Sequence, residues 1–172
     1  MDDGKTGVIT GEKQVRKQRV QKNWIKMLLN FIRYGKCRWL CIRTFFLAGY
    51  FRHAILKKEP EELHRTWGWR GEESALEAPE EAYQYAGKVG YAVEMVCERT
   101  PWESKCLVKA LCAQYFLDKR KISSTLYLGC GVGETGEMLA HAWLRCGSMY
   151  VTGGDGTGYA VVDRYAKGRE HN

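Results

Sequence analysis

The sequence lacks the patterns that hold metal ions or disulfide frameworks. It has no C-x-x-C pair, and its four histidines (His53, His64, His141 and His171) are widely separated. Structural zinc sites use closely spaced cysteines and histidines, so we expect no metal site, and we expect no cofactor. The seven cysteines are odd in number and scattered, and no signal peptide precedes them. We therefore expect no disulfide framework, and the pattern favours a reduced, cytoplasmic protein.

Long uncharged apolar runs are missing as well. The most apolar stretch, residues 37–56, is interrupted by Arg38, Arg43, Arg52 and His53. These residues leave no window long enough to span a bilayer. We interpret the stretch as a helix that packs on the main domain. Peripheral contact with a membrane surface is the alternative.

Acidic residues are scarce at the start of the chain. Residues 1–58 hold 14 Lys and Arg against three acids, a net charge of +11, whereas the whole chain carries +7. The rest of the chain must therefore carry −4. Such asymmetry is typical of a chain that contacts nucleic acid, an acidic membrane surface or an acidic peptide or protein. Because no RNA-binding signature or zinc-finger spacing accompanies the charge, we expect no nucleic acid partner.

Composition and apolar period divide the chain into four regions. We expect a disordered tail over 1–15, a basic helical N-terminal region over 16–58, a linker or irregular loop over 59–79 and a domain over 80–168. The helices predicted in the basic region run over about 20–35 and 37–56. The domain should contain helices over 80–97 and from Thr100 to about 119–121, followed by strands near 122–130, 138–146, 149–153 and 159–166. Helices followed by antiparallel strands are typical of the α+β class.

Residues 100–106 carry the signature of a helix start. Thr100 is a good N-cap, Pro101 suits the first helical position, and Glu103 completes a T-x-x-E capping box. This interpretation places Cys106 in the second turn of the helix, where free N–H groups and the helix dipole favour a thiolate. A small buried cysteine without chemistry is the alternative.

Residues 125–136 (TLYLGCGVGETG) contain a G-x-G-x-x-G pattern and resemble the glycine loop of an S-adenosylmethionine-dependent methyltransferase. Tyr127, however, occupies the position where that loop usually has an acid. Only 36 residues follow Gly136, too few for the remaining βα units of a nucleotide-binding sheet. We therefore interpret the segment as a hairpin loop between antiparallel strands, with the methyltransferase as an alternative.

His141 lies in a predicted strand, on the same face as Trp143 and Arg145. An acid, Asp155, follows one strand later. A cysteine on a helix, followed by a histidine and an acid on consecutive strands, is the order found in papain-like and transglutaminase-like enzymes. Asp163 is a second candidate for the acid.

The position of Asp155 depends on the register of the predicted hairpin. If Arg145 pairs with Met149 across a three-residue loop, His141 lies opposite Gly153 and Asp155 is its diagonal neighbour on the same face. A two-residue loop would move Asp155 to the other face unless the chain bulges there.

Four motifs in this order resemble those of one peptidase family. They are RTPWESKCLVKA (99–110), STLYLG (124–129), AHAWLR (140–145) and YVTGG (150–154). They are similar to the lasso-peptide biosynthesis leader peptidases, which are transglutaminase-like cysteine peptidases of microcin-type maturation systems. The resemblance is strong over residues 80–166 and weaker over the basic helices at 20–56.

The resemblance implies a transglutaminase/papain-like core, with a catalytic helix packed on a small antiparallel sheet. It also implies a thiol peptidase that cleaves the leader from a ribosomally made lasso-peptide precursor. That cleavage would free the core N-terminus for macrocyclisation by a separate, asparagine-synthetase-like lasso cyclase. Cys106 would be the nucleophile and His141 the general base. The family's acid lies about a dozen residues after the histidine, whereas Asp155 lies fourteen residues after it.

Two further expectations concern binding. We expect Trp102 and Trp143 to shape the substrate groove, with ordinary core packing as the alternative for each. We expect the basic N-terminal region to bind the acidic part of the leader, a small leader-recognition protein or the cyclase. A non-catalytic peptide-binding adaptor of the same shape is the competing function, and the reactivity of Cys106 would distinguish the two.

Overall fold

The computed structural model describes residues 38–168 of the chain. The predicted tail at 1–15 and the predicted helix at about 20–35 lie outside the described residues. The chain divides into two units, Met1–Arg38 and Trp39–Asn172, and the description below concerns the second unit.

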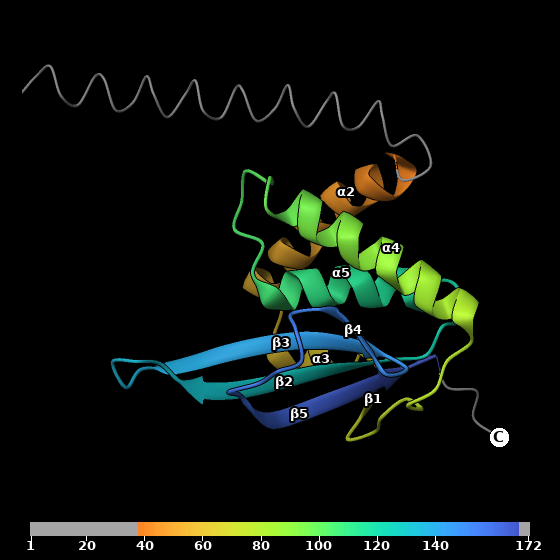
Figure 1. Cartoon of the computed structure of the whole chain (residues 1–172). Helices are drawn as coiled ribbons and strands as arrows, with labels where there is room; N and C mark the ends of the chain where they lie inside the picture. The colour runs from red at the N-terminus through yellow and green to blue at the C-terminus, as the bar shows by residue number, and fades with distance from the viewer. Residues whose placement is uncertain (1–37, 169–172) are drawn as a thin grey trace, which may run out of the picture. The chain divides into compact units, whose positions relative to one another are not determined.

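The described residues form helices on one side of an antiparallel sheet, as Figure 1 shows. The strand order is β1-β5-β2-β3-β4, and the α+β class predicted from the sequence is confirmed. In chain order the elements are α2 (Arg38–Lys57), α3 (Pro60–His64), β1 (Trp69–Arg70), α4 (Glu80–Cys97), α5 (Cys106–Asp118), β2 (Ser124–Val132), β3 (Met138–Cys146), β4 (Met149–Thr152) and β5 (Ala160–Lys167).

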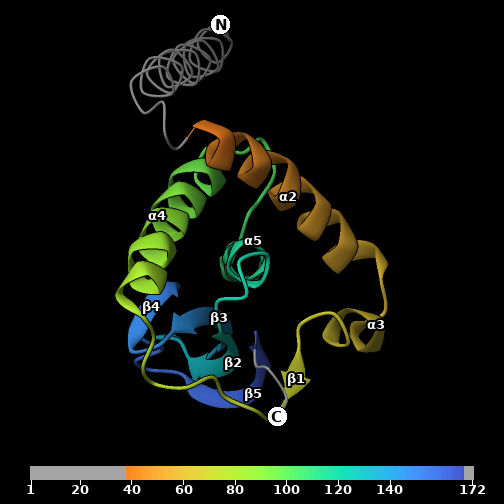
Figure 2. The ribbon, with the colours of Figure 1, turned by 90° about the vertical axis from the view of Figure 1, so that its right-hand side faces the viewer.

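Helix α5 is the centre of the fold. Figure 2 shows it almost end-on, with α2 and α4 on two sides and the sheet below. A helix that is apolar around its whole circumference has to be enclosed by other elements, and the sequence CLVKALCAQYFLD meets that condition. Its buried residues are Val108, Ala110, Leu111, Cys112, Ala113, Gln114, Phe116 and Leu117.

The central strands divide their side chains between two faces of the sheet. Strands β2 and β3 pair without interruption, so their side chains alternate regularly. Leu126, Leu144 and Cys146 lie in the same core cluster as the α5 residues, and we call their side the α5 face. Tyr127 and Trp143 stack on each other on the opposite side, the far face.

Residues 125–136 belong to β2 and the turn that joins it to β3. A strand, not a capped helix, follows the glycines. The hairpin interpretation of this segment is therefore confirmed, and the fold has no nucleotide-binding loop at this position.

The segment 59–79, expected to be a linker or irregular loop, contains α3 and β1. β1 pairs with β5, Trp67 is only 4% exposed, and the backbone N–H of Ser74 donates to Thr125 Oγ1 over 2.8 Å. The segment thus wraps around the sheet as part of the domain. Most residues of this segment are charged or polar, and only a few, such as Leu63, Trp67 and Ser74, are buried. The sequence pattern therefore favoured a linker.

Helix α2 packs on the domain as one of its own elements. Ala48 and Ala54 lie in the core cluster that contains the α5 residues, and Cys41 and Thr44 are also buried. The expected basic region over 16–58 is therefore split, because its second helix belongs to the domain unit. Among the described helices, none has the length and apolarity needed to cross a membrane.

Helix α4 crosses β4 at a glycine, and this contact gives a first prediction. A Cβ at Gly90 would lie 2.4 Å from the carbonyl oxygen of Val151, whereas a Cβ at the exposed Gly87 would meet nothing within 4 Å. We expect Gly90→Ala to lower the free energy of unfolding by about 1–3 kcal/mol, because the helix must move off the strand. Gly87→Ala should raise it by about 0.5–1 kcal/mol.

Urea denaturation of the two glycine variants measures these effects, with Gly87→Ala as the matched control for helix propensity. Equal stabilisation by both alanines would contradict the close approach of α4 to β4.

Candidate active site

Cys106 is the first residue of α5. Lys105 precedes it as the N-cap residue in an extended conformation, without a side-chain cap, and the first turn contains no acidic residue. The free N–H groups and the positive end of the helix dipole therefore face the partly exposed Cys106 thiol. This position favours a thiolate and could stabilise an oxyanion formed next to it.

The predicted capping box does not form, and the prediction of a helix from Thr100 was wrong. The Thr100 hydroxyl lies 3.0 Å from the carbonyl oxygen of Cys97 and 2.9 Å from that of Trp102. Glu103 lies 3.5 Å from the Arg52 guanidinium instead of reaching back to the cap. The Thr100 side chain thus fixes a bend, and the helix starts only at Cys106.

Trp102 explains the bend. Its ring packs on Phe45 of α2, with ring centroids 5.0 Å apart, and it lies so close to Gly49 that a Cβ there would be 3.1 Å from it. This tertiary contact draws the segment before Cys106 across to α2. The expected role of Trp102 in a substrate groove stays a prediction, because the described contacts show a packing role.

His141 lies on the far face, as predicted, with Trp143. The register pairs Gly129 with His141 and Tyr127 with Trp143. Trp143 is only 3% exposed and stacks on both Tyr127 and His141. The described contacts therefore give Trp143 a core role beneath the imidazole.

The backbone carbonyl of Gly153 orients the imidazole of His141. The His141 Nε2 lies 2.7 Å from that carbonyl oxygen, and a carbonyl can only accept, so Nε2 carries the hydrogen. In the neutral ring, Nδ1 is then the acceptor. Tyr159 stacks on the imidazole with centroids 4.6 Å apart. His141 is thus held as the tautomer whose Nδ1 can take a proton.

The β3–β4 hairpin explains how Gly153 reaches His141. Cys146 pairs with Met149 across a two-residue turn, and the register shifts between Leu144 and Arg145. The three-residue loop considered from the sequence is therefore absent, and β4 bulges instead. After the bulge, Gly153 has a φ of +78°, and a Cβ on it would lie 2.5 Å from the carbonyl oxygen of Ala142. Only glycine fits this close approach.

The two candidate acids have other partners. Exposed Asp155 accepts the backbone N–H of Thr157 over 2.9 Å, and this hydrogen bond lowers the pKa of its carboxyl group. Asp163 accepts the Tyr165 hydroxyl and Arg70 Nε, each over 2.8 Å. Partial burial acts to raise the pKa of Asp163, but its hydrogen bonds lower it overall. Among the described hydrogen bonds, none joins either carboxylate to His141.

Cys106 begins α5, and His141 is the fourth residue of β3 after the β2–β3 hairpin. β2 begins soon after α5 ends and runs back below it, so the first turn of α5 lies toward the β2–β3 hairpin (Figure 1). The two residues belong to different faces, because α5 covers one face and His141 extends from the other. In the described part of the chain, no hydrogen bond joins the thiol and the imidazole.

The edge of β3 lies between these two faces. β4 ends at Thr152, which pairs with Leu144, so among the described strands none lies outside β3 beside His141.

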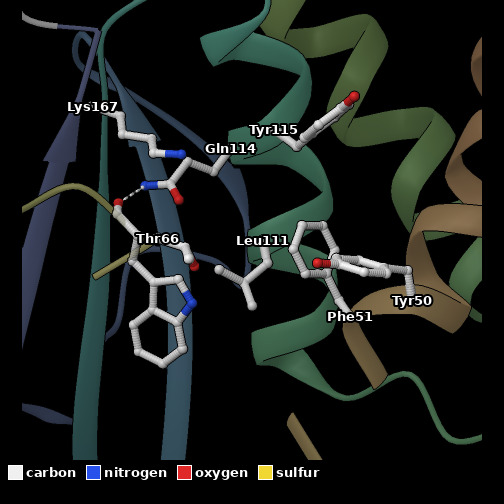
Figure 3. A pocket seen from close by; sticks show the side chains of 8 residues that line it. Tyr50, Phe51, Thr66, Leu111, Gln114, Tyr115 and Lys167 are labelled. Atoms are coloured by element: carbon white, nitrogen blue, oxygen red, sulfur yellow. Dashed lines mark hydrogen bonds between the residues drawn. The ribbon is translucent and has the colours of Figure 1, made fainter. Parts of the chain in front are cut away.

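A separate cavity of about 200 Å³ lies between α2, α5 and the segment before β1. Figure 3 shows the side chain of Leu111 at its centre and Gln114 donating to the backbone carbonyl of Trp67. The cavity is smaller than typical ligand pockets, and none of the site residues predicted from the sequence lines it. Its lining residues are Tyr50, Phe51, Thr66, Trp67, Leu111, Gln114, Tyr115 and Lys167.

Comparison with known proteins identifies the family. The family model described as the transglutaminase-like superfamily matches residues 61–164, a span that contains α5, the whole of β2–β4 and all but the first two residues of the segment that had been expected to be a linker. Neither the curated proteins nor the solved structures gave a match. Proteins of this superfamily generally carry cysteine protease or transferase activity. Helices packed on a small antiparallel sheet agree with this match, and the chain belongs to the transglutaminase-like superfamily.

Proposed function

We propose that this protein is a cytoplasmic cysteine peptidase that removes the leader from a ribosomally synthesised lasso-peptide precursor. The observation that carries the proposal is the position of Cys106. It opens the central helix of a transglutaminase-like domain, with an uncapped helix terminus behind its thiol. The oriented His141 lies on β3, a strand that packs against the same helix. The four motifs that resemble the leader peptidases support the finer choice of substrate.

In the proposed reaction, His141 Nδ1 takes the proton of the Cys106 thiol, and the sulfur attacks the carbonyl carbon of the scissile peptide bond. The Cys106 backbone N–H donates to the resulting oxyanion. His141 then protonates the departing amine, which becomes the free N-terminus of the core peptide. Water, deprotonated by His141, hydrolyses the thioester and releases the leader.

The carbonyl of Gly153 takes the orienting role that an acid has in a triad. Gly153 follows His141 by twelve residues, about the spacing of the acid in the leader peptidases that the motifs resemble. A carbonyl accepts the Nε2 hydrogen as a carboxylate would, but it carries no full charge. It therefore fixes the tautomer while stabilising the imidazolium less.

In the proposed mechanism, the thiol and the imidazole come together when substrate binds. Catalytic hydrogen bonds are often long in the free enzyme and tighten in the substrate complex. Both side chains are partly exposed. The Gly153 carbonyl and the rings of Trp143 and Tyr159 hold the imidazole in place, so in this mechanism the approach requires a shift of the first turn of α5 relative to β3. The open edge of β3 is where the substrate would lie.

The test is cleavage of a synthetic precursor peptide, taken from a short reading frame beside the gene, with the products identified by mass spectrometry. The proposal expects one cut between leader and core. The assay should be repeated with the neighbouring leader-recognition protein and cyclase, since the activity could need them. An intact precursor under all these conditions would contradict the function.

Because Asp155 makes no described contact with His141, it should contribute little to catalysis. We expect Asp155→Ala to change kcat/KM for the precursor by less than about threefold, in line with the small effects of surface substitutions. Initial rates of cleavage measure this, with His141→Ala as the inactive reference. A loss of a hundredfold or more in a folded Asp155→Ala protein would show that the carboxylate turns toward His141 during catalysis.

We also propose that the basic N-terminal residues bind the partners named above. Residues 1–37 carry nine Lys and Arg against three acids, which suits an acidic leader segment, the recognition protein or the cyclase. Deleting residues 1–37 leaves the domain unit intact and should weaken binding of the labelled leader at low salt. Unchanged binding of the leader would contradict this role, and loss of vesicle binding alone would favour membrane contact.

One observation supports a non-catalytic adaptor as the second candidate. Among the described hydrogen bonds, none joins Cys106 to His141, and His141 has a carbonyl in place of an acid. An adaptor would bind the precursor as tightly as the enzyme does, yet leave it uncut in the complete system.

A further inference from the structure

The outer edge of β3 is open over half its length. β3 spans Met138–Cys146, but β4 pairs only with Leu144, Arg145 and Cys146. Over residues 138–142, no other described strand pairs with this edge. A strand edge without a partner presents backbone donors and acceptors in a row.

The register shows which backbone groups point outward. The N–H of Gly133 donates to the carbonyl of Glu137 over 2.8 Å, so this is a hydrogen-bonded pair of the β2–β3 ladder. Because such pairs alternate along an antiparallel ladder, Leu139 and His141 direct their backbone groups toward β2. Met138, Ala140 and Ala142 direct theirs to the open edge. Consistently, the Ala142 carbonyl faces Gly153, outside β3.

The side chains at this edge are apolar and exposed. Met138 is 82% exposed and Leu139 38%, and Val132, which pairs with Met138 from β2, is 78% exposed. Natural edge strands are usually protected by charged side chains, proline or a covering segment. Residues 138–142 (MLAHA) contain no lysine, no acid and no proline, so this edge lacks the usual protection against another strand.

We infer that the open edge of β3 binds an extended segment of the peptide substrate as an added strand, an inference that rests on the proposed peptidase function. The added strand would exchange hydrogen bonds with the N–H and C=O groups of Met138 and Ala140. Its side chains would alternate between the two faces. One set would contact Met138 and the other Leu139, so apolar residues are expected at these positions.

The occupant follows from the position of the edge. His141 lies between the two outward-facing residues Ala140 and Ala142, so a strand bound there passes next to the imidazole. The bound strand would also lie between the two faces of the sheet: the α5 face, covered by the helix that Cys106 begins, and the far face, from which His141 extends. A second copy of the chain fits less well, because the edge offers only five residues before Gly153 closes it.

Proline at position 140 tests the inference on the protein side. Ala140→Pro removes an outward N–H that pairs with no other described strand, which an edge strand tolerates. Ala140→Val keeps the N–H and is the matched control. We expect Ala140→Pro to raise KM for the precursor about five- to tenfold, because loss of its N–H and crowding at the edge weaken the pairing. Ala140→Val should raise KM clearly less than Ala140→Pro does, because the N–H is kept.

Two readouts separate this effect from damage to the site. The rate at which iodoacetamide alkylates Cys106 and the thermal midpoint of unfolding should match wild type in both variants. Equal KM values for Ala140→Pro and Ala140→Val would overturn the inference. So would a change in dimerisation with no change in KM, which would assign the edge to a second copy.

A scan of the substrate keeps the inference testable even if Ala140→Pro does not fold. Precursor peptides N-methylated at one residue at a time are assayed with the wild-type protein. Pairing with β3 predicts that KM rises at alternate residues near the cut, because only every second N–H points to the edge. Uniform effects would overturn the inference.

Measuring peptide binding distinguishes failure of the proposed peptidase function from failure of the added-strand inference. If wild type does not cut the precursor, the Cys106→Ala protein still reports binding of the fluorescent N-methylated set. Alternation in the dissociation constants then supports the added strand without catalysis, and its absence overturns it.

Discussion

Cys106→Ala is expected to abolish precursor cleavage, with a fall in kcat/KM of at least about a thousandfold, because the proposed reaction passes through a thioester on the Cys106 sulfur. The matched control is Cys130→Ala. Cys130 is also partly exposed, but it lies within β2, opposite Ala140, and no helix begins at it. Its replacement should leave kcat/KM within about threefold, because it takes no part in the proposed thioester chemistry.

His141→Ala should cause a loss of similar size. Residues that act in one chemical step are strongly non-additive, so the Cys106→Ala, His141→Ala double variant should be no slower than the slower single variant. Initial rates measured by mass spectrometry provide the test. Either single variant retaining a tenth of the wild-type rate would contradict the assigned roles.

Arg145→Ala is expected to cause the largest loss of stability. The Arg145 side chain is only 4% exposed, and it donates to the Tyr127 hydroxyl over 2.9 Å and to the carbonyls of Gly147 and Ser74 over 2.6 and 3.0 Å. Its guanidinium also lies 3.3 Å from a carboxylate oxygen of Glu73. It thus joins the segment before α4 to the β3–β4 turn.

Removing Arg145 leaves these buried acceptors without a donor, so we expect the free energy of unfolding to fall by about 3–5 kcal/mol. Arg164→Ala is the matched control, because Arg164 contacts the same Glu73 over 2.6 Å but is 46% exposed. It should cost less than about 1 kcal/mol. Urea denaturation measures both, and similar losses for the two variants would contradict the structural role of Arg145.

The elements with the clearest period were predicted correctly from the sequence. The helix predicted over 80–97 and the strand predicted over 138–146 are α4 and β3 with the same bounds. In both, apolar residues follow one period without interruption, and glycines or prolines mark the ends. In α4 and β3 the spacing of apolar residues agrees with the packing of the folded domain, so the sequence pattern alone was enough to predict their bounds.

The start of α5 was predicted wrongly because a tertiary contact overrides the local signal. Thr100, Pro101 and Glu103 form a good capping pattern, but the packing of Trp102 on Phe45 draws this segment out of the helix. Phe45 lies 57 residues earlier in the sequence. No local pattern could report that contact.

The side chains of the candidate site could be predicted from the sequence, but the backbone carbonyl that orients His141 could not. Cys106 and the face of His141 could be read from motifs and alternation. The partner of His141 could not, because a backbone carbonyl has no residue type, and its position depends on the bulge in β4. The glycines after β4 were the available signal, and the sequence analysis treated Gly153 only as the residue opposite His141.

The most direct test of the account is peptide mapping of the wild-type protein after brief treatment with iodoacetamide at neutral pH. Among the described cysteines, only Cys106 and Cys130 are partly exposed. The hydrogen bond from Cys112 lowers the pKa of Cys97, but Cys97 is only 5% exposed and should be protected. The account predicts that Cys106 is alkylated first and that precursor cleavage disappears in proportion. Alkylation of Cys130 first, or full cleavage activity after Cys106 has been modified, would contradict it.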